Sequence, residues 1–200
     1  MKRIDLDIDK FSNDEVGIVA DIFKAGKIGV IPTDTIYGLS ALAKDKKAIA
    51  GIYKIKKRAK TKPLILLMKS FCMIRKYCYL NTKQYEYIKK ELNAKKPLTV
   101  ILRNKSKEFE YLANENQGLS VRIPQGNSFL MKVIKKINEP IVSTSLNLSG
   151  EKAILDLKNL DEKINIRQID FILDIGKIKK AKASKIVDIS NIKSIKLIRK

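Results

Sequence analysis

The sequence predicts a single α/β domain built around an open, twisted, mixed sheet with flanking helices. Segments with strand patterns alternate with segments with helical patterns along the 200 residues. No internal repeat, low-complexity tract or Pro/Gly-rich linker separates them, so one domain is expected over residues 1–200. Hydrophobic residues make up 44% of the chain, and a chain of this length can bury a substantial core.

The first three predicted elements are a strand, a helix and a second strand. Apolar and charged residues alternate in "IDLDI", which is the pattern of a half-buried strand. Ser12 and Glu15 form a capping box at the start of the helix that follows, and Gly26 ends this helix. Residues 28–32 are predicted to form the second strand.

The next helix is predicted over 45–58, with Asp45 as its N-cap. The stripe of apolar residues on this helix would next reach Lys56, so a cation continues a buried face. The run "PLILLM", residues 63–68, is continuously apolar, which is expected of a strand that is covered on both faces.

The rest of the chain continues the alternation of helices and strands. Helical patterns recur at 83–93 and at 127–137, and Asn127 caps the second of these helices. Residues 146–168 are expected to form a loop with a short helix. Strand patterns lie at 98–102, 119–124, 140–145, 171–175, 185–189 and 195–198.

The chain is strongly basic. Lys and Arg number 42 and Asp and Glu 21, which gives a formal net charge of +21. A charge of this size favours a polyanionic partner such as RNA, a nucleotide or an anionic lipid. A generally lysine-rich composition explains it equally well, because the lysines occur on nearly every polar face rather than in one block.

Several classes of site are excluded by the composition. The chain has no histidine, which removes a His-based Ser or Cys triad, the HExxH zinc helix and a His general base. Cys72 and Cys78 cannot complete a zinc tetrahedron, so both are expected to be free thiols in a reducing cytosol. The N-terminus has a strand pattern, and the longest apolar run is too short to span a bilayer. A cytoplasmic protein with no membrane partner is therefore expected.

Four places interrupt the local pattern of the predicted elements. The first is the run 32–35, "PTDT", which presents hydroxyls at the carboxyl end of a strand, where open α/β sheets bind ligands. A plain turn rich in Thr and Asp is the alternative. The second is the pair Lys56 and Arg58, two cations suited to a triphosphate. A cationic helix C-terminus with a snorkelling lysine is the alternative there.

The third place is "STSLNLSG", residues 143–150, whose short hydroxyls and amide can bind phosphate, ribose or carboxylate. The alternative is an N-cap or an Asx-turn. The fourth is Arg122, which shares one face of its predicted strand with Ser120. Arg122 receives a carboxylate or a phosphate if that face borders a cleft, and is merely solvated if it borders water.

Read together, "IPTDTIYGL", "IKKRAKTKPLILL", "SVRIP", "STSLNLSG" and "SKIVDI" resemble the YrdC/TsaC family of threonylcarbamoyl-AMP synthases. The resemblance runs from about residue 12 to the C-terminus and corresponds to the short, single-domain form. It implies a mostly parallel-stranded sheet that encloses a large concave cavity. It also implies that L-threonine, bicarbonate and ATP are converted to threonylcarbamoyl-AMP and pyrophosphate. A separate transferase complex then modifies adenosine 37 of tRNAs that read ANN codons.

The resemblance also implies roles for individual residues. The family's nucleotide-binding and catalytic tetrad falls on Lys56, Arg58, Ser145 and Asn147. Further contacts to ATP are implied for Lys62, Ser120 and Arg199, and contacts to threonine for Thr35, Arg122, Ser143 and Ser184. Mg²⁺ is expected to bridge the phosphates through water and ATP oxygens, without a dedicated set of protein ligands.

Three positions depart from the family pattern. Ala59 stands where many members have proline, and Leu67 where many have a histidine near threonine. Lys185 replaces the usual second hydroxyl of the last motif. The Leu67 change bears on one contact to threonine and does not remove the nucleotide tetrad. Two other functions stay open: a nucleotide-binding relative that uses another acceptor, and an RNA-binding module without this chemistry, which the net charge of +21 favours.

We predict weak, salt-sensitive RNA binding if the charge of +21 serves a polyanion. The logarithm of the binding constant should fall steeply with the logarithm of salt concentration, because each phosphate that Lys or Arg neutralises releases counterions. Titration of an RNA at several salt concentrations measures this slope. A flat response, or no binding at low salt, would mean that the lysines reflect composition only.

Overall fold

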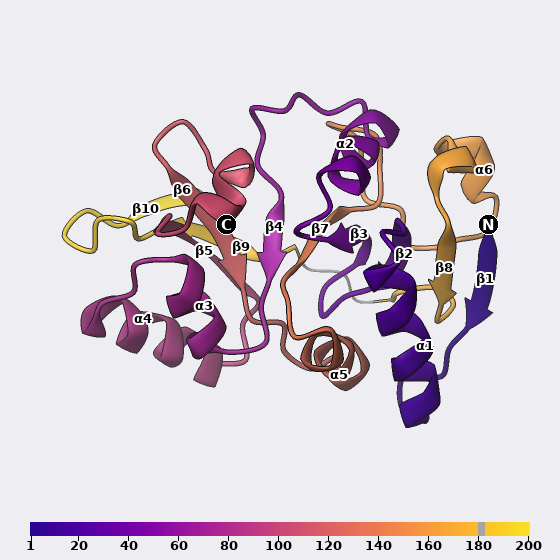
Figure 1. Ribbon diagram of the computed structural model, residues 1–200, viewed down its shortest axis with the longest axis horizontal. Helices are drawn as coiled ribbons and strands as arrows, with labels where there is room; N and C mark the ends of the chain where they lie inside the picture. The colour runs from indigo at the N-terminus through magenta and orange to yellow at the C-terminus, as the bar shows by residue number, and fades with distance from the viewer. Residues whose placement is uncertain (180–182) are drawn as a thin grey trace.

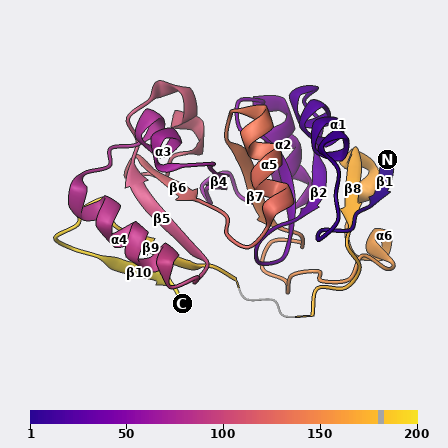
Figure 2. The same ribbon diagram turned by 90° about the horizontal axis from the view of Figure 1, so that it is seen from below.

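The computed structural model describes residues 1–179 and 183–200, and its ten strands form one open mixed sheet with flanking helices (Figures 1 and 2). The strand order is β1-β8-β2-β3-β7-β4-β6-β5-β9-β10. The strands are β1 (Lys2–Asp5), β2 (Gly29–Pro32), β3 (Tyr37–Leu42), β4 (Ile65–Leu67), β5 (Leu98–Arg103), β6 (Gly118–Arg122), β7 (Ile141–Ser145), β8 (Phe171–Asp174), β9 (Lys185–Asp188) and β10 (Lys196–Arg199). The helices are α1 (Asn13–Lys24), α2 (Lys46–Ile55), α3 (Phe71–Tyr77), α4 (Thr82–Asn93), α5 (Ser128–Ile137) and α6 (Leu160–Lys163), with 3₁₀ helices η1 (Lys107–Leu112) and η2 (Ile166–Gln168).

The mixed sheet is confirmed, but the expectation that it is mostly parallel is wrong. Four of the neighbouring strand pairs are parallel: β1–β8, β8–β2, β4–β6 and β5–β9. The other five pairs are antiparallel. The reason is visible at residues 33–36, where a short turn joins β2 directly to β3, and only antiparallel strands can be joined by so short a connection.

Most predicted elements are confirmed, including the capping box of α1 and the Asn127 cap of α5. The strand β3 and the helix α3 have no counterpart in the prediction. The strand is rich in small residues instead of β-branched ones, and the helix is too short for a period to be recognised. The helix α2 ends at Ile55, earlier than predicted, because Lys57 adopts a left-handed conformation with φ of 48°.

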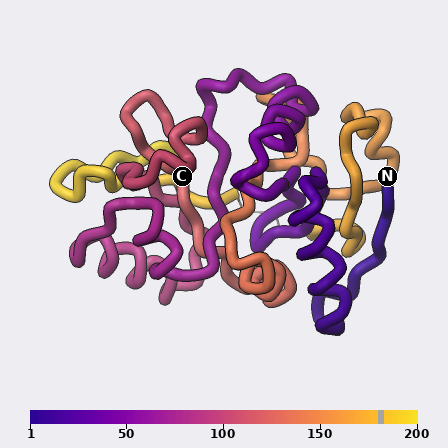
Figure 3. Tube along the Cα trace, viewed as in Figure 1, coloured from indigo at the N-terminus to yellow at the C-terminus, as the bar shows by residue number. Residues whose placement is uncertain are grey.

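Apolar side chains form two clusters on opposite faces of the sheet. The larger cluster packs α2, α3 and α4 against one face. The smaller one packs α1 and α5, which lie against each other, onto the other face of β2, β4, β7 and β8. Figure 3 shows the N-terminal strand β1 beside β8, although β8 comes much later in the sequence.

The apolar run at β4 is covered on both faces, as its sequence predicts. Leu66 lies in the larger cluster and Leu67 in the smaller one. Strand β6 differs from β4 because only one of its faces is apolar. Leu119 and Val121 enter the larger cluster, whereas Ser120 and Arg122 lie on the opposite face. The second face of the sheet is therefore apolar under α1 and α5 and polar beyond them.

Two expectations from the sequence, on the cysteines and on membrane-spanning segments, can be compared with the structure. Cys72 is exposed and Cys78 is buried, and neither forms a disulfide. Burial raises the pKa of the Cys78 thiol to about 12. Over the part of the chain that the structure describes, no helix is both long enough and apolar enough to cross a bilayer.

Gly38 allows β3 to lie close to β7. It pairs with Ser145, and a Cβ atom at this position would lie 2.3 Å from Ser143 Oγ and 3.1 Å from Thr33 Cγ2. Any larger residue must push these side chains apart. The glycine therefore sets where the hydroxyls of β7 and of the turn before β3 lie.

We predict that Gly38→Ala destabilises the protein by about 1–3 kcal/mol, because it overpacks this contact. The melting temperature should fall by about 2–4 °C for each kcal/mol. The control is Gly17→Ala in α1, where a Cβ meets no atom within 4 Å. Alanine should raise stability there by about 0.5–1 kcal/mol. Thermal melts measure both variants, and an unchanged melting temperature in Gly38→Ala would contradict the packing argument.

Candidate active site

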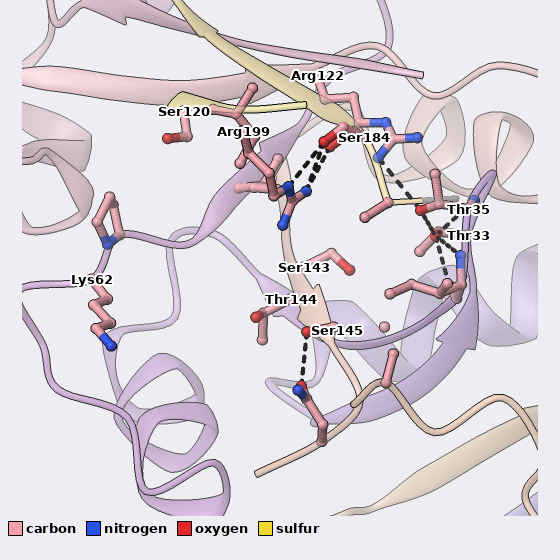
Figure 4. A pocket seen from close by; sticks show the side chains of 18 of the residues that line it. Thr33, Thr35, Lys62, Ser120, Arg122, Ser143, Thr144, Ser145, Ser184 and Arg199 are labelled. Carbon is pink, nitrogen blue, oxygen red and sulfur yellow. Dashed lines mark hydrogen bonds between the residues drawn. The ribbon is translucent and has the colours of Figure 1, made fainter. Parts of the chain in front are cut away.

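A cavity of about 590 Å³ opens on the polar part of the second face of the sheet. Strands β3 to β7, β9 and β10 contribute to it, together with the loops before β3, before β4 and after β7. Figure 4 shows labelled side chains from these elements around one hollow. Ten of the eleven predicted site residues line it: Thr35, Arg58, Lys62, Ser120, Arg122, Ser143, Ser145, Asn147, Ser184 and Arg199.

The exception is Lys56, whose side chain is buried behind the cavity wall. The residue is only 1% exposed, so it does not snorkel. Its ammonium donates hydrogen bonds to the Ser145 carbonyl, to the Asn147 carbonyl at 2.8 Å and to Asn147 Oδ1 at 2.7 Å. Burial, and secondly the charge of Arg58, lowers the pKa of Lys56 to about 8. Since three acceptors use its three N–H groups, Lys56 holds the loop after β7 in place.

That loop presents Ser145 and Asn147 to the cavity. Ser145 Oγ donates to Asn147 Oδ1 at 2.8 Å, and Asn147 Nδ2 donates to the Glu151 carbonyl at 2.6 Å. The backbone N–H of Ser149 donates back to the Lys56 carbonyl at 2.9 Å. Three members of the predicted tetrad, Lys56, Ser145 and Asn147, are thus connected by hydrogen bonds, with the buried lysine behind the other two.

Arg58 and Lys62 form the cationic side of the cavity next to α2. The Arg58 guanidinium donates from Nε to the Lys62 carbonyl and from Nη2 to the Pro63 carbonyl, both at 3.1 Å. Partial burial lowers the pKa of Arg58. These bonds fold residues 58–63 into a compact loop, and the remaining guanidinium N–H groups, which have no partner among the described residues, can bind an anion.

The turn before β3 brings Thr33 and Thr35 to the cavity (Figure 4). Thr33 Oγ1 accepts from the backbone N–H groups of Thr35 and Ile36, both at 3.2 Å, and donates to the Ile36 carbonyl at 2.7 Å. The two hydroxyl oxygens lie 3.0 Å apart. Because the Thr33 proton goes to a carbonyl, Thr35 donates its own proton to Thr33, and its oxygen stays an acceptor that faces Arg122 and the cavity.

Two guanidinium groups form the cationic side near this turn. Arg122 Nη2 pairs with Asp34 Oδ2 at 2.6 Å, and Nη1 reaches Thr35 Oγ1 at 3.5 Å. Arg199 donates to the Ser184 carbonyl from both Nε and Nη2, at 3.1 and 2.8 Å. Burial, and secondly the charge of Arg122, lowers the pKa of Arg199. This side is therefore electropositive and suited to a carboxylate.

Serine hydroxyls complete the lining. Ser143 Oγ accepts from Ser40 Oγ at 3.0 Å, and Ser184 Oγ lies 2.9 Å from Thr99 Oγ1. The predicted site residues do not include the lining residues Thr33, Thr144 and Gly150, which lie inside quoted motifs, or Glu151, which directly follows one. They also do not include the apolar lining residues Ile36, Ile65, Ile101, Ile186 and Ile198. Of these, Ile101 and Ile198 lie outside every quoted motif.

The three departures from the family pattern lie in different places. Leu67 lines the cavity and pairs in register with Arg122. Lys185 points to Glu91, with 3.6 Å between the charged atoms, and does not line the cavity. Ala59 is exposed outside it. Within the described residues, no group of three or more Cys, Asp or Glu side chains is placed to hold a metal ion.

Comparison with known proteins gives consistent matches. A model of the Sua5/YciO/YrdC family, described as "Telomere recombination", matches residues 21–200. A putative threonylcarbamoyl-AMP synthase of Methanocaldococcus jannaschii is 34% identical over 173 residues, which cover 86% of this chain and 79% of that protein. The human threonylcarbamoyl-AMP synthase is 26% identical over 155 residues, which cover 78% of this chain and 53% of that protein.

Solved structures share the fold. E. coli YciO has a TM-score of 0.84 at 21% identity and covers 100% of this chain and 94% of its own. P. abyssi Sua5 complexed with L-threonine has a TM-score of 0.82 at 24% identity. The match covers 99% of this chain and 56% of Sua5. The chain thus spans about half the length of the human synthase and of Sua5.

We predict that Lys56→Met both destabilises the protein and lowers the activity associated with the cavity. Each buried acceptor left without a donor costs about 1–3 kcal/mol. Misplacement of Ser145 and Asn147 should lower kcat by about 10²–10³, the usual loss when a group that stabilises charge is removed. Thermal melts and turnover measurements test this, with exposed Lys54→Met as the control that removes one charge from the same helix. A wild-type melting temperature with lost activity would mean that Lys56 contacts the ligand directly.

Proposed function

The chain belongs to the Sua5/YciO/YrdC family, and on this basis we propose that it is an L-threonylcarbamoyladenylate synthase. It would convert L-threonine, bicarbonate and ATP to threonylcarbamoyl-AMP, pyrophosphate and water. The relatives named threonylcarbamoyl-AMP synthase support this, and so does the structural likeness to Sua5 bound to L-threonine. One observation carries the proposal: a single cavity is lined by two separate groups of cations, each with hydroxyl groups beside it.

The nucleotide would lie beside α2 and the loop after β7. Arg58 and Lys62 would neutralise the triphosphate, and Arg58 can offer a planar pair of N–H groups. Ser145 and Asn147, held from behind by Lys56, would contact the phosphates or the ribose. Ser120 and Arg199 border the same cavity. Ser120 would contact the nucleotide from β6, and Arg199, which lies near Arg122 on the amino-acid side, would contact it from β10 where the two ligands meet.

The amino acid would lie beside the turn that precedes β3. Thr35 Oγ1 is an acceptor on the cavity side and suits the ammonium or the hydroxyl of threonine. Arg122 would bind the carboxylate. Ser143 and Ser184 would complete this side, and Leu67 gives it an apolar surface for the methyl group.

The proposed reaction needs positioning more than a strong base. Threonine and bicarbonate form an N-carboxylate with loss of water, and this carboxylate attacks the α-phosphate while the bond to pyrophosphate breaks. Fixed cations stabilise the charge that develops on the phosphate oxygens. A chain without histidine can perform this step.

Mg²⁺ fits this arrangement as an ion carried by the nucleotide. Among the described residues Glu151 is the one carboxylate in the cavity lining, so the protein would supply at most one such ligand. The ion would neutralise charge on the phosphates, and most of its ligands would be water and phosphate oxygens.

The product would pass to a separate transferase complex that modifies adenosine 37 of tRNAs reading ANN codons. The protein would then act in the cytoplasm, where tRNA is present. An RNA-binding module without chemistry is the second candidate, favoured only by the net charge of +21.

We predict that the purified protein releases pyrophosphate from ATP only when threonine and bicarbonate are both present. Omission of either substrate is the first control. Arg58→Lys is the second test, because it keeps the charge and loses the planar pair of donors, so kcat/KM should fall by about tenfold or more. Pyrophosphate release that does not depend on threonine would indicate another acceptor. No release under any condition would favour the RNA-binding module.

A further inference from the structure

Asp34 lies behind the cavity wall, and among the described residues its side chain hydrogen-bonds one residue of the cavity lining, Arg122. The Asp34 side chain is 2% exposed and the Arg122 side chain 5% exposed. Asp34 Oδ2 accepts from Arg122 Nη2 at 2.6 Å and from the backbone N–H of Gln125 at 3.0 Å. Arg122 lines the cavity, whereas Asp34 does not. Any effect of Asp34 on a ligand must therefore act through Arg122.

The geometry of the turn explains why the neighbouring side chains of Asp34 and Thr35 point in different directions. The Thr33 hydroxyl accepts from the two backbone N–H groups that follow Asp34, which folds the chain tightly at this point. Thr35 then points to the cavity, and Asp34 points towards β6 and the residues after it. One turn thus supplies both a ligand-facing hydroxyl and a buried carboxylate.

The ion pair leaves part of the guanidinium free. Asp34 engages Nη2, and Nη1 reaches Thr35 at the long distance of 3.5 Å. In the part of the chain that the structure describes, Arg122 Nε is buried and has no hydrogen-bond partner. An unused donor that is buried at a cavity wall costs free energy unless a ligand accepts from it.

The ion pair of Asp34 and Arg122 also lowers the net positive charge on this side of the cavity. Arg122 and Arg199 face the same side of the cavity, and each is a permanent cation. Asp34 is the carboxylate that pairs with Arg122 among the described residues. Without it, the repulsion between the two guanidinium groups would be uncompensated, and Arg122 would lose its one ion pair among the described residues.

We propose that Asp34 is a positioning residue for the amino-acid side of the cavity. It fixes the Arg122 guanidinium by one charge-assisted bond, so that the other N–H groups are set to receive the carboxylate of the amino-acid substrate. This inference rests on the proposed function and adds to it a residue that never touches the substrate. It requires that removal of the Asp34 charge weakens binding of the amino acid and leaves binding of ATP unchanged.

The test is Asp34→Asn, which keeps the size and an oxygen acceptor for the Gln125 N–H but removes the charge. The matched control is Asp170→Asn: Asp170 Oδ2 also accepts a backbone N–H, from Ile28 at 2.8 Å, and Oδ1 pairs with Lys27 at 3.4 Å. Asp170 lies outside the cavity lining. Steady-state pyrophosphate release gives KM for each substrate, and thermal melts with and without threonine report binding without turnover.

For Asp34→Asn we expect KM for threonine to rise about 10–100-fold and KM for ATP to stay within about twofold, because a small misplacement of one group has effects of this size. The threonine-induced shift in melting temperature should disappear. Asp170→Asn should keep both KM values and that shift. Asp34→Glu keeps the charge but moves it by one methylene. It should also raise KM for threonine, but by less than Asp34→Asn does.

Equal KM values for threonine in the two Asn variants would overturn the inference. So would a parallel rise in both KM values together with a fall in melting temperature, since that is a structural effect. If Asp34→Asn does not fold, Asp34→Glu decides by the same criteria. A wild-type protein that neither binds threonine nor reacts with it would overturn the proposed function as well, so the two failures are distinguishable.

Discussion

The buried ammonium of Lys56 is the interaction on which the nucleotide side of the cavity depends. It stands at the end of α2, where the apolar stripe of the helix would continue, and it draws three oxygen atoms of Ser145 and Asn147 towards itself. Ser149 returns a hydrogen bond to the Lys56 carbonyl. A cation buried without such partners would be far too costly, so the helix end and the loop after β7 must form together. The hydroxyl and amide on the cavity side are thereby held in fixed positions.

The three arginines of the site differ from Lys56 because they have hydrogen-bond donors left for a ligand. Arg58, Arg122 and Arg199 each donate some of their N–H groups to oxygen atoms of the protein, and the other N–H groups remain for the cavity. A guanidinium suits this division, because it has five donors in a rigid plane, whereas an ammonium has three on one atom. Lys56 has no donor left, so it supports the site from behind. Orientation of the arginines is thus settled when the chain folds, and less of it has to be gained on ligand binding.

Local pattern was sufficient for most elements, and the resemblance to a family supplied ten of the residues that line the cavity. The caps, the alternation of strands and the spacing of the motifs depend on neighbouring residues, which a sequence displays. The direction of strand pairing does not, and the hairpin of β2 and β3 was missed because β3, rich in small residues, has no strand pattern. The burial of Lys56 follows from the helical stripe, but its partners lie 89 and 91 residues away. Asp34 likewise belongs to a predicted turn, whereas its partner Arg122 is 88 residues further along the chain.

The anchoring of the cations also separates the two candidate ligands. A polynucleotide backbone needs cations that reach outward from a surface. Three of the cations that face the cavity, Arg58, Arg122 and Arg199, instead donate hydrogen bonds to oxygen atoms of the chain, and Arg122 is buried. A space of about 590 Å³ accommodates a small ligand and excludes a helical polynucleotide. If the protein also binds RNA, the exposed lysines must bind it, and the two kinds of binding would occupy separate surfaces. The arrangement of these cations thus favours a small anionic substrate in the cavity, which the net charge alone does not.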